Sequence, residues 1–303
     1  MVKEPFFSVI IPTYNRAAFV LNAIQSVMKQ VFSDWELIVV DDGSTDNTKD
    51  VVTGLDDQRI RYIYQQNAER SAARNNGIRH ARGKFICFLD SDDVYLPNHL
   101  ESFHKLILEK NEAEGMYVSN VVRNEFGKIV DVPFENAADY RNPVCFFLEA
   151  EESIIPARVC IHKAIWNDYK FDESLKDVED MVLWVQIVSK YPLFQTPDQT
   201  SIYFLHHYNS TNLANNPFGN QLVGLKKIFG DPALNKMIPS SVRKQKLSRC
   251  YQAIAEFNFY QKDYPQMMRN LVTSIFWNPN SPSTKAKLRM MGAGFARALG
   301  LKR

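Results

Sequence analysis

Short apolar runs of β type alternate with segments of helical periodicity along the N-terminal third of the chain. This alternation constrains the fold most, because strands joined by helices of this length form a largely parallel, doubly wound sheet. The predicted strands are residues 6–11, 36–40, 60–64 and 84–89, and the predicted helices between them are 17–31, 45–55 and 70–82. The sequence therefore predicts an α/β fold with a mostly parallel sheet flanked by helices.

Beyond this third, strand and helix patterns continue and then give way to an almost continuously helical pattern. Strands are expected at 115–132 (with a turn at 124–127), 158–162 and 201–207, and helices at 143–152 and 178–190. The polar stretch 209–220 has the composition of a boundary. We therefore expect an α/β domain over residues 1–215, followed by a small all-helical region over residues 216–303.

The end of the chain, residues 285–303, is a basic amphipathic segment in which Leu288, Met291 and Phe295 recur among Lys and Arg. Such a segment lies on an anionic membrane surface, or packs its apolar side on the protein and leaves its charges in water. Both alternatives stay open at this point.

Composition excludes several classes of protein. The 36 Lys and Arg nearly balance the 34 Asp and Glu, so no basic field predicts a nucleic-acid partner. The four cysteines are scattered without metal-ligand spacing, which is typical of reduced thiols in a cytosolic protein. No segment approaches the roughly 18 apolar residues that span a bilayer, and the N-terminus lacks a signal-peptide core. We expect a cytoplasmic protein, at most peripheral at the inner face of a membrane.

One predicted strand ends in the acidic loop Asp90-Ser91-Asp92-Asp93. Like charges this close repel unless a cation neutralises them, and a divalent metal that holds a phosphate would do so. The alternative is a helix cap, because Asp92 or Asp93 could open the helix expected from residue 97.

Two other strand ends carry polar residues, at 12–16 and 41–44. The carboxyl ends of parallel strands lie at one edge of a sheet, so the three loops should converge there. Tyr14 would offer an aromatic face to a base, and Asp41 or Asp42 would accept hydrogen bonds from a base or a ribose. No glycine-rich phosphate loop follows a strand, so metal and side chains, Arg74 above all, would meet the phosphate charge. Together these loops predict a site for a nucleoside diphosphate.

Four ordered motifs, residues 9–16, 36–46, 73–78 and 81–93, resemble those of the family 2 glycosyltransferases, which have the GT-A fold. The resemblance implies that nucleotide is bound by Pro12, Thr13, Tyr14, Asp42, Arg74, Asp90 and Ser91. It also implies a divalent cofactor, Mn²⁺ or Mg²⁺, held by Asp90 and Asp92. The segment 206–211 resembles the family's H-x-x-N-x-[ST] pattern, which would bring His206 to the metal or the diphosphate. A hydrogen-bonded structural histidine is the alternative.

The resemblance further implies a catalytic carboxylate in Glu179-Asp180, which precedes an apolar run through Trp184. Transfer needs a base to deprotonate an acceptor hydroxyl, and a single base opposite the leaving group predicts inversion. Asp180 is the candidate base and Glu179 the second candidate. The alternative is an acidic helix N-terminus. Gln186 stands where relatives often carry Arg, so any substrate contact made by that Arg would differ here.

These observations predict a metal-dependent inverting glycosyltransferase that moves a sugar, from a UDP-sugar by resemblance, to a glycan or lipid-linked acceptor in polysaccharide biosynthesis. One alternative is a non-catalytic module that binds nucleotide sugar or glycan on the same fold. The other is a nucleotidyltransferase, which would need a glycine-rich basic loop after the first strand. Whether the chain forms a homo-oligomer stays open.

Overall fold

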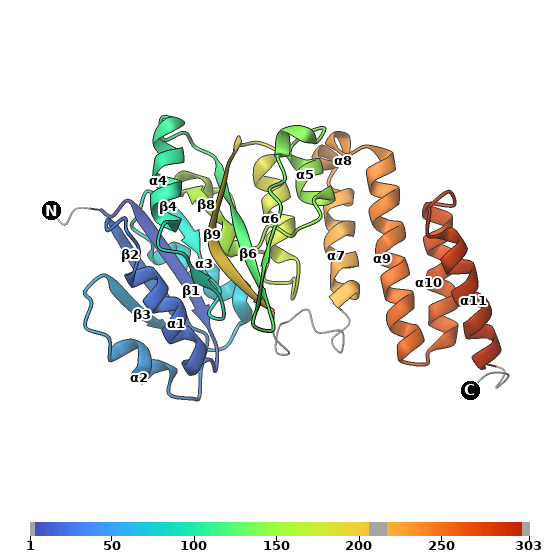
Figure 1. Ribbon diagram of the computed structural model, residues 1–303, viewed down its shortest axis with the longest axis horizontal. Coiled ribbons are helices and arrows are strands. Elements are labelled where there is room, and N and C mark those ends of the chain that lie inside the picture. The colour runs from blue at the N-terminus through green and yellow to red at the C-terminus, as the bar shows by residue number, and fades with distance from the viewer. Residues whose placement is uncertain (1–3, 206–216, 299–303) are drawn as a thin grey trace. The chain divides into compact units, whose positions relative to one another are not determined.

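The computed structural model describes residues 4–205 and 217–298. The chain forms two compact units, residues 1–206 and 207–303, and we describe each by itself. The boundary expected at residue 215 lies outside the described residues. Figure 1 shows an α/β unit and a unit built of helices.

The first half of the sheet follows the predicted alternation. Its parallel strands lie in the order β3-β2-β1-β4, and helices link them along the chain. The strands are β1 (Phe7–Thr13), β2 (Trp35–Asp41), β3 (Ile60–Tyr64) and β4 (Phe85–Phe88), and the helices are α1 (Ala17–Met28), α2 (Thr48–Thr53) and α3 (Glu69–His80). The doubly wound pattern expected for the N-terminal third is confirmed.

The second half of the sheet is mixed in direction. β8 pairs antiparallel with both β4 and β6, whereas β9 runs parallel to β6 and antiparallel to β5. β7 pairs with the end of β6 as the predicted hairpin. The strands are β5 (Val94–Tyr95), β6 (Met116–Glu125), β7 (Lys128–Asp131), β8 (Val159–His162) and β9 (Leu193–Leu205); the helices are α4 (His99–Glu109), α5 (Pro143–Glu149) and α6 (Glu179–Val188), with short 3₁₀ turns at Ala137–Asp139, Pro156–Arg158 and Lys163–Asn167.

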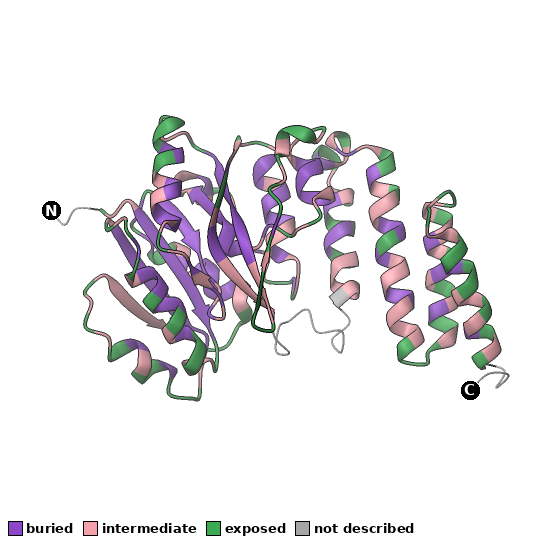
Figure 2. Cartoon of the chain, viewed as in Figure 1, coloured by how far each residue is buried: buried purple, intermediate pink, exposed green. Residues whose placement is uncertain are grey.

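The core lies on both faces of the central strands, which Figure 2 shows as buried. On one face, Val9 and Ile11 of β1 share a cluster with residues of α1 and α4. On the other face, Ile10 meets Gly77 of α3 so closely that a Cβ on Gly77 would lie 2.5 Å from Ile10 Cγ2. This close approach seats α3 firmly on the middle of β1.

Two helices begin later than the sequence predicts. α2 begins at Thr48 rather than at residue 45, because the preceding residues bond to the loop after β1. Asp93 does not cap α4, which begins at His99 after Asn98. Asp93 instead accepts a hydrogen bond from the backbone N–H of Phe204 at 3.0 Å.

The helical unit contains α7 (Pro217–Gly230), α8 (Pro232–Met237), α9 (Ser240–Tyr260), α10 (Tyr264–Trp277) and α11 (Thr284–Ala298). Its core includes Ala255, Met267 and Leu271. Lys287 of α11 points inward and donates to Ser248 Oγ at 2.9 Å, whereas Leu288 and Phe295 stay exposed. Across the part of the chain that the structure describes, no helix is long and apolar enough to cross a membrane.

Candidate active site

The loops that follow β1 and β2 are tied together by hydrogen bonds. Asn15 N–H donates to Ser44 Oγ at 2.8 Å, and Thr45 N–H donates to Asn15 Oδ1 at 2.7 Å. Asn15 has a φ of 51°, a left-handed conformation that asparagine tolerates better than most residues. The first two of the three predicted loops are therefore neighbours at the carboxyl edge of the sheet.

Asp42 is held at the start of the second loop. Its Oδ1 accepts from Gln65 Nε2 at 2.6 Å and from Ala68 N–H at 2.9 Å, and its own N–H donates to Thr13 O. Burial raises the pKa of Asp42 above its ordinary value, although these hydrogen bonds act in the opposite direction. The result is a fixed, nearly buried acceptor beside the end of β1.

The residues predicted to line a nucleoside site differ in exposure. Pro12 and Thr13 are buried, while the Tyr14 side chain is 47% exposed and open to a planar ligand. Thr13 Oγ1 is a buried hydroxyl without a hydrogen-bond partner among the described residues. Buried polar groups are normally satisfied, so an unpaired hydroxyl here fits a position that a ligand completes.

The third loop joins the first through an ion pair. Arg16 Nη1 lies 2.5 Å from Asp92 Oδ2, and neighbouring Ser91 is buried. Burial, then the charges of Asp92 and Asp90, raise the pKa of Asp93 well above its ordinary value. The structure thus brings the three predicted loops together, as expected from the parallel strand order.

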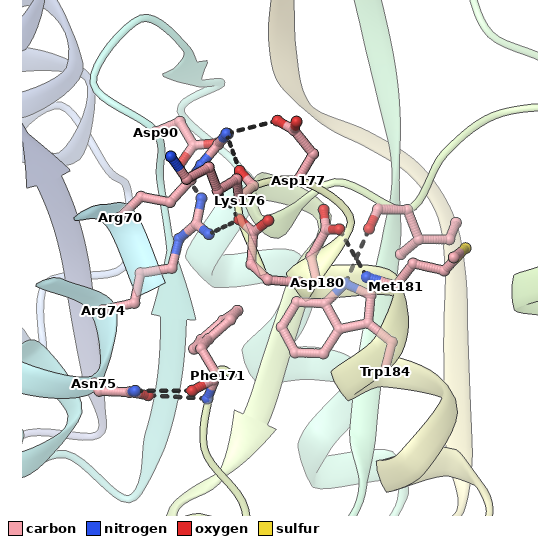
Figure 3. Close-up of polar contacts among 12 residues, drawn as sticks. Arg70, Arg74, Asn75, Asp90, Phe171, Lys176, Asp177, Asp180, Met181 and Trp184 are labelled. Carbon is pink, nitrogen blue, oxygen red and sulfur yellow. Dashed lines mark hydrogen bonds and ion pairs between the residues drawn. The ribbon is translucent and has the colours of Figure 1, made fainter. Parts of the chain in front are cut away.

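Arg74 links the third loop to the predicted catalytic segment. Its Nη2 donates to Asp90 Oδ1 at 2.6 Å and its Nη1 to Glu179 Oε1 at 2.7 Å, and its side chain is 1% exposed. Burial tends to raise the pKa of Asp90, but the charge and hydrogen bond of Arg74, together with the charges of Arg70 and Arg16, keep that pKa below its ordinary value. Figure 3 shows Arg74 reaching from α3 toward Asp90.

Asp180 lies in the first turn of α6, immediately after Glu179. The residue before them, Val178, has a φ of 59°, which costs energy for a β-branched residue. Burial, and next the charge of Glu179, raise the pKa of Asp180 to about 7. A carboxylate with such a pKa suits proton transfer near neutral pH better than an ordinary aspartate does.

Asp90 and Asp92 offer the carboxylate ligands that a divalent cation would need, and each also contacts an arginine: Asp90 contacts Arg74 and Asp92 contacts Arg16. Mg²⁺ typically takes one or two carboxylates and completes its shell with water and substrate oxygens. Asp90 keeps a 30% exposed side chain although Arg74 engages one of its oxygens. The described residues contain no group of three or more His, Cys, Asp or Glu side chains placed to hold a metal. His206 lies outside the described residues.

Single-sequence reasoning missed several contacts of this region. Arg16 lies in the motif at residues 9–16, but no site role was predicted for it. Its ion pair with Asp92 joins loops more than seventy residues apart along the chain. Asn75 and Arg70 hold the segment before α6, with partners about a hundred residues away. Asn75 could have been singled out from the sequence, because it lies beside Arg74 in the motif at residues 73–78.

The fold and these loops define the class of proteins to which the chain belongs. The glycosyl transferase family 2 profile matches residues 8–165. The chain belongs to glycosyl transferase family 2, and its α/β unit has the predicted GT-A type of fold.

Two bacterial relatives show how far the similarity extends. The chain is 42% identical over 182 residues to an Escherichia coli protein named UDP-Glc:alpha-D-GlcNAc-diphosphoundecaprenol beta-1,3-glucosyltransferase WfgD, covering 60% of this chain and 69% of the relative. It is 30% identical over 237 residues to an uncharacterized glycosyltransferase of Rickettsia felis, covering 78% of this chain. The chain spans only 39% of that longer Rickettsia protein.

Two solved structures share the fold. S. aureus TarS in complex with UDP-GlcNAc has a TM-score of 0.64 at 17% identity, with 97% of this chain and 92% of that chain covered. Mannosyltransferase PcManGT from Pyrobaculum calidifontis, in complex with GDP-Man and Mn²⁺, has a TM-score of 0.58 at 15% identity, with 99% and 89% covered. At these identities the likeness shows the fold alone.

Proposed function

We propose that this chain transfers a sugar from a nucleotide-diphosphate donor to an acceptor hydroxyl with inversion at the anomeric carbon. The observation that carries the proposal is the bridge from Asp90 through Arg74 to Glu179. A single buried arginine joins the candidate diphosphate loop to the turn that bears the candidate base. This proximity is what a one-step displacement requires, because base and leaving group act on the same carbon.

In the proposed reaction, Asp180 accepts the proton of the acceptor hydroxyl. At the same time, the oxygen of that hydroxyl bonds to the anomeric carbon. The bond from that carbon to the diphosphate oxygen breaks, and the electron pair leaves with the diphosphate. Attack from the face opposite the leaving group inverts the configuration. The raised pKa of Asp180 favours this role over that of a mere helix-terminus charge.

The donor side of the proposal uses the three loops. In this proposal Tyr14 stacks on the base. Asp42 accepts a hydrogen bond from the nucleoside, and the Thr13 hydroxyl accepts or donates one. Arg74 keeps Asp90 deprotonated on the side of the diphosphate. Mn²⁺ or Mg²⁺, held by Asp90 and Asp92 with His206 as a further candidate ligand, would stabilise the charge of the leaving diphosphate.

The finer choice of substrates rests on relatives. We propose a UDP-sugar as donor, supported by the UDP-Glc in the name of the E. coli relative and the UDP-GlcNAc bound to TarS. We propose a lipid-linked glycan as acceptor, in polysaccharide assembly at the inner face of a membrane, because the same relative is named for a diphosphoundecaprenol substrate.

A donor panel tests this proposal. Purified protein is mixed with Mn²⁺, UDP-, GDP- and dTDP-sugars and lipid-linked acceptors, and UDP release and glycan product are measured. The proposal expects transfer from one UDP-sugar. Metal-dependent UDP binding without turnover of any donor would instead favour a binding module, and pyrophosphate release from a nucleoside triphosphate would favour a nucleotidyltransferase.

A further inference from the structure

The segment that leads into α6 has little regular structure of its own. Residues 171–178 contain turns and bends but no strand or helix, and they end at the left-handed Val178. No ladder of backbone hydrogen bonds fixes them, so side chains from elsewhere must do so if the first turn of α6 is to keep one position.

Asn75 of α3 holds the beginning of this segment through both ends of its amide. Its Nδ2 donates to Phe171 O at 2.9 Å, and its Oδ1 accepts from Phe171 N–H at 2.9 Å. The same Nδ2 lies 2.9 Å from Glu173 Oε1, and the side chain is buried. This two-way contact with one backbone residue imitates a strand pairing, as Figure 3 shows.

Arg70 of α3 holds the end of the segment. Its Nη2 donates to Lys176 O at 2.7 Å and to Asp177 Oδ1 at 2.9 Å, and its Nε lies 3.6 Å from Glu179 Oε1. Arg74, one turn further along α3, adds the buried contact with Glu179. Three side chains of one helix therefore hold the segment at its start, at its end and at the first residue of α6.

α3 is itself anchored at the nucleotide side. Ala68, the residue before α3, donates its N–H to Asp42, and Gly77 packs tightly on Ile10 of β1. A displacement of α3 would therefore move the nucleoside acceptor and the catalytic turn together.

We propose that α3 is a positioning element that holds Asp180 in register with the bound donor, and that Arg70 and Asn75 are its positioning residues. The inference rests on the proposed function, because it names how the base of that reaction is held. Neither residue needs to touch substrate: each acts through its backbone and side-chain contacts with residues 171–179.

The test compares Arg70→Gln with Arg70→Lys, Asp177→Asn and Asn75→Ala. Arg79→Gln is the matched control, because Arg79 is an exposed arginine on the same helix whose Nη2 donates to Asn76 Oδ1 within that helix. Steady-state kcat, the donor KM, the UDP Kd and amide hydrogen exchange of residues 172–181 are measured for each.

We expect Arg70→Gln to lower kcat by about 10- to 100-fold, since small misplacements of a catalytic group cost rate steeply. The UDP Kd should stay near the wild-type value, because the nucleotide loops keep their contacts. Exchange of residues 176–181 should become faster. Asp177→Asn removes the charge but keeps an accepting oxygen, so it should change kcat and exchange in the same direction by a smaller amount. Arg70→Lys should recover part of the rate, and Arg79→Gln should change nothing.

An unchanged kcat in Arg70→Gln and Asp177→Asn would overturn the proposal, as would equal losses in kcat and UDP affinity. Hydrogen exchange separates this outcome from a failure of the proposed function. If the wild-type protein binds UDP but transfers no sugar, faster exchange confined to residues 172–181 in Arg70→Gln still supports the positioning role, and unchanged exchange refutes it.

Discussion

Two carboxylates set the chemistry at the scale of single residues. Asp90 and Asp180 are both connected to Arg74, Asp90 directly and Asp180 through the neighbouring Glu179. The pKa of Asp90 is lowered by the arginine, whereas that of Asp180 is raised to about 7. Pairs of acids pushed apart in this way are typical of sites that need one permanent charge and one proton acceptor.

The pH dependence of transfer follows from Asp180. The base acts when deprotonated, so kcat/KM should be full above the folded-state pKa and fall tenfold per pH unit as the pH drops below about 7. The free energy of unfolding depends on pH in the opposite direction to kcat/KM. The raised carboxyl pKa of Asp180 stabilises the fold at low pH, and this contribution is lost as the pH rises through that pKa. A pH profile with its acidic limb near pH 4 would contradict the assignment.

Asp42 offers a test of the nucleoside site. Asp42→Asn keeps the shape of the side chain but removes its charge, and a hydrogen bond to a charged group is worth about 1.5–3 kcal/mol. We expect UDP to bind roughly 10- to 100-fold more weakly, measured by titration calorimetry. Asp50→Asn on the exposed face of α2 is the control. Equal affinities for the Asp42 variant and wild type would remove Asp42 from the site.

At the scale of elements, α3 is the helix whose placement matters most. An added Cβ on Gly77 would lie 2.5 Å from the Ile10 side chain, and both residues are buried. Gly77→Ala should therefore lower the free energy of unfolding of the α/β unit by about 1–3 kcal/mol, as overpacking does. Urea unfolding measures this change.

Gly292→Ala in α11 is the matched control, because a Cβ there meets nothing within 4 Å. Alanine is the better helix former, so this variant should be neutral or more stable by about 0.5–1 kcal/mol. A Gly77→Ala protein as stable as the control would show that α3 can shift on β1.

The elements that sequence could predict are those fixed by local pattern. β1 to β4 are short apolar runs between amphipathic helices, and their parallel order follows from chain connectivity. The first half of β9 was missed, since a strand was expected only from residue 201 and Pro197 with its polar neighbours lacks a strand pattern. In the structure Pro197 falls where the β6–β9 register shifts between Val118 and Asn120, so the ladder accommodates it.

In the candidate site, too, features set by local pattern could be predicted and long-range contacts could not. Its three loops were predictable because each follows a recognisable strand. The contacts that hold the catalytic turn were not, because Arg70 and Asp177 lie 107 residues apart and no local pattern joins them. Asp93 was misread as a cap because its partner, the backbone of Phe204, belongs to the last strand of the sheet.

At the scale of the whole molecule, α11 is a candidate membrane contact. It carries Lys285, Arg289 and Arg297 on exposed positions, exposes Leu288 and Phe295, and contains no acidic residue. We expect the protein to sediment with vesicles of phosphatidylcholine and phosphatidylglycerol but not with phosphatidylcholine alone. Lys285→Gln with Arg289→Gln should weaken this binding by about 1 kcal/mol per charge.

The control for that prediction is Phe126→Ser, which removes an exposed aromatic residue from the α/β unit. It should leave vesicle binding unchanged, while Leu288→Ser with Phe295→Ser should weaken it. Equal sedimentation with both kinds of vesicle, or with neither, would contradict a membrane role for this surface.

The central claim is that Asp180 removes the proton of the acceptor. Its most direct test is Asp180→Asn, which keeps the side-chain volume and an oxygen to accept from Met181 N–H. We predict that UDP affinity is retained and that sugar transfer falls by about 10²- to 10⁴-fold, with Asp198→Asn at an exposed position of β9 as the unaffected control. Transfer by Asp180→Asn at the wild-type rate would contradict the account.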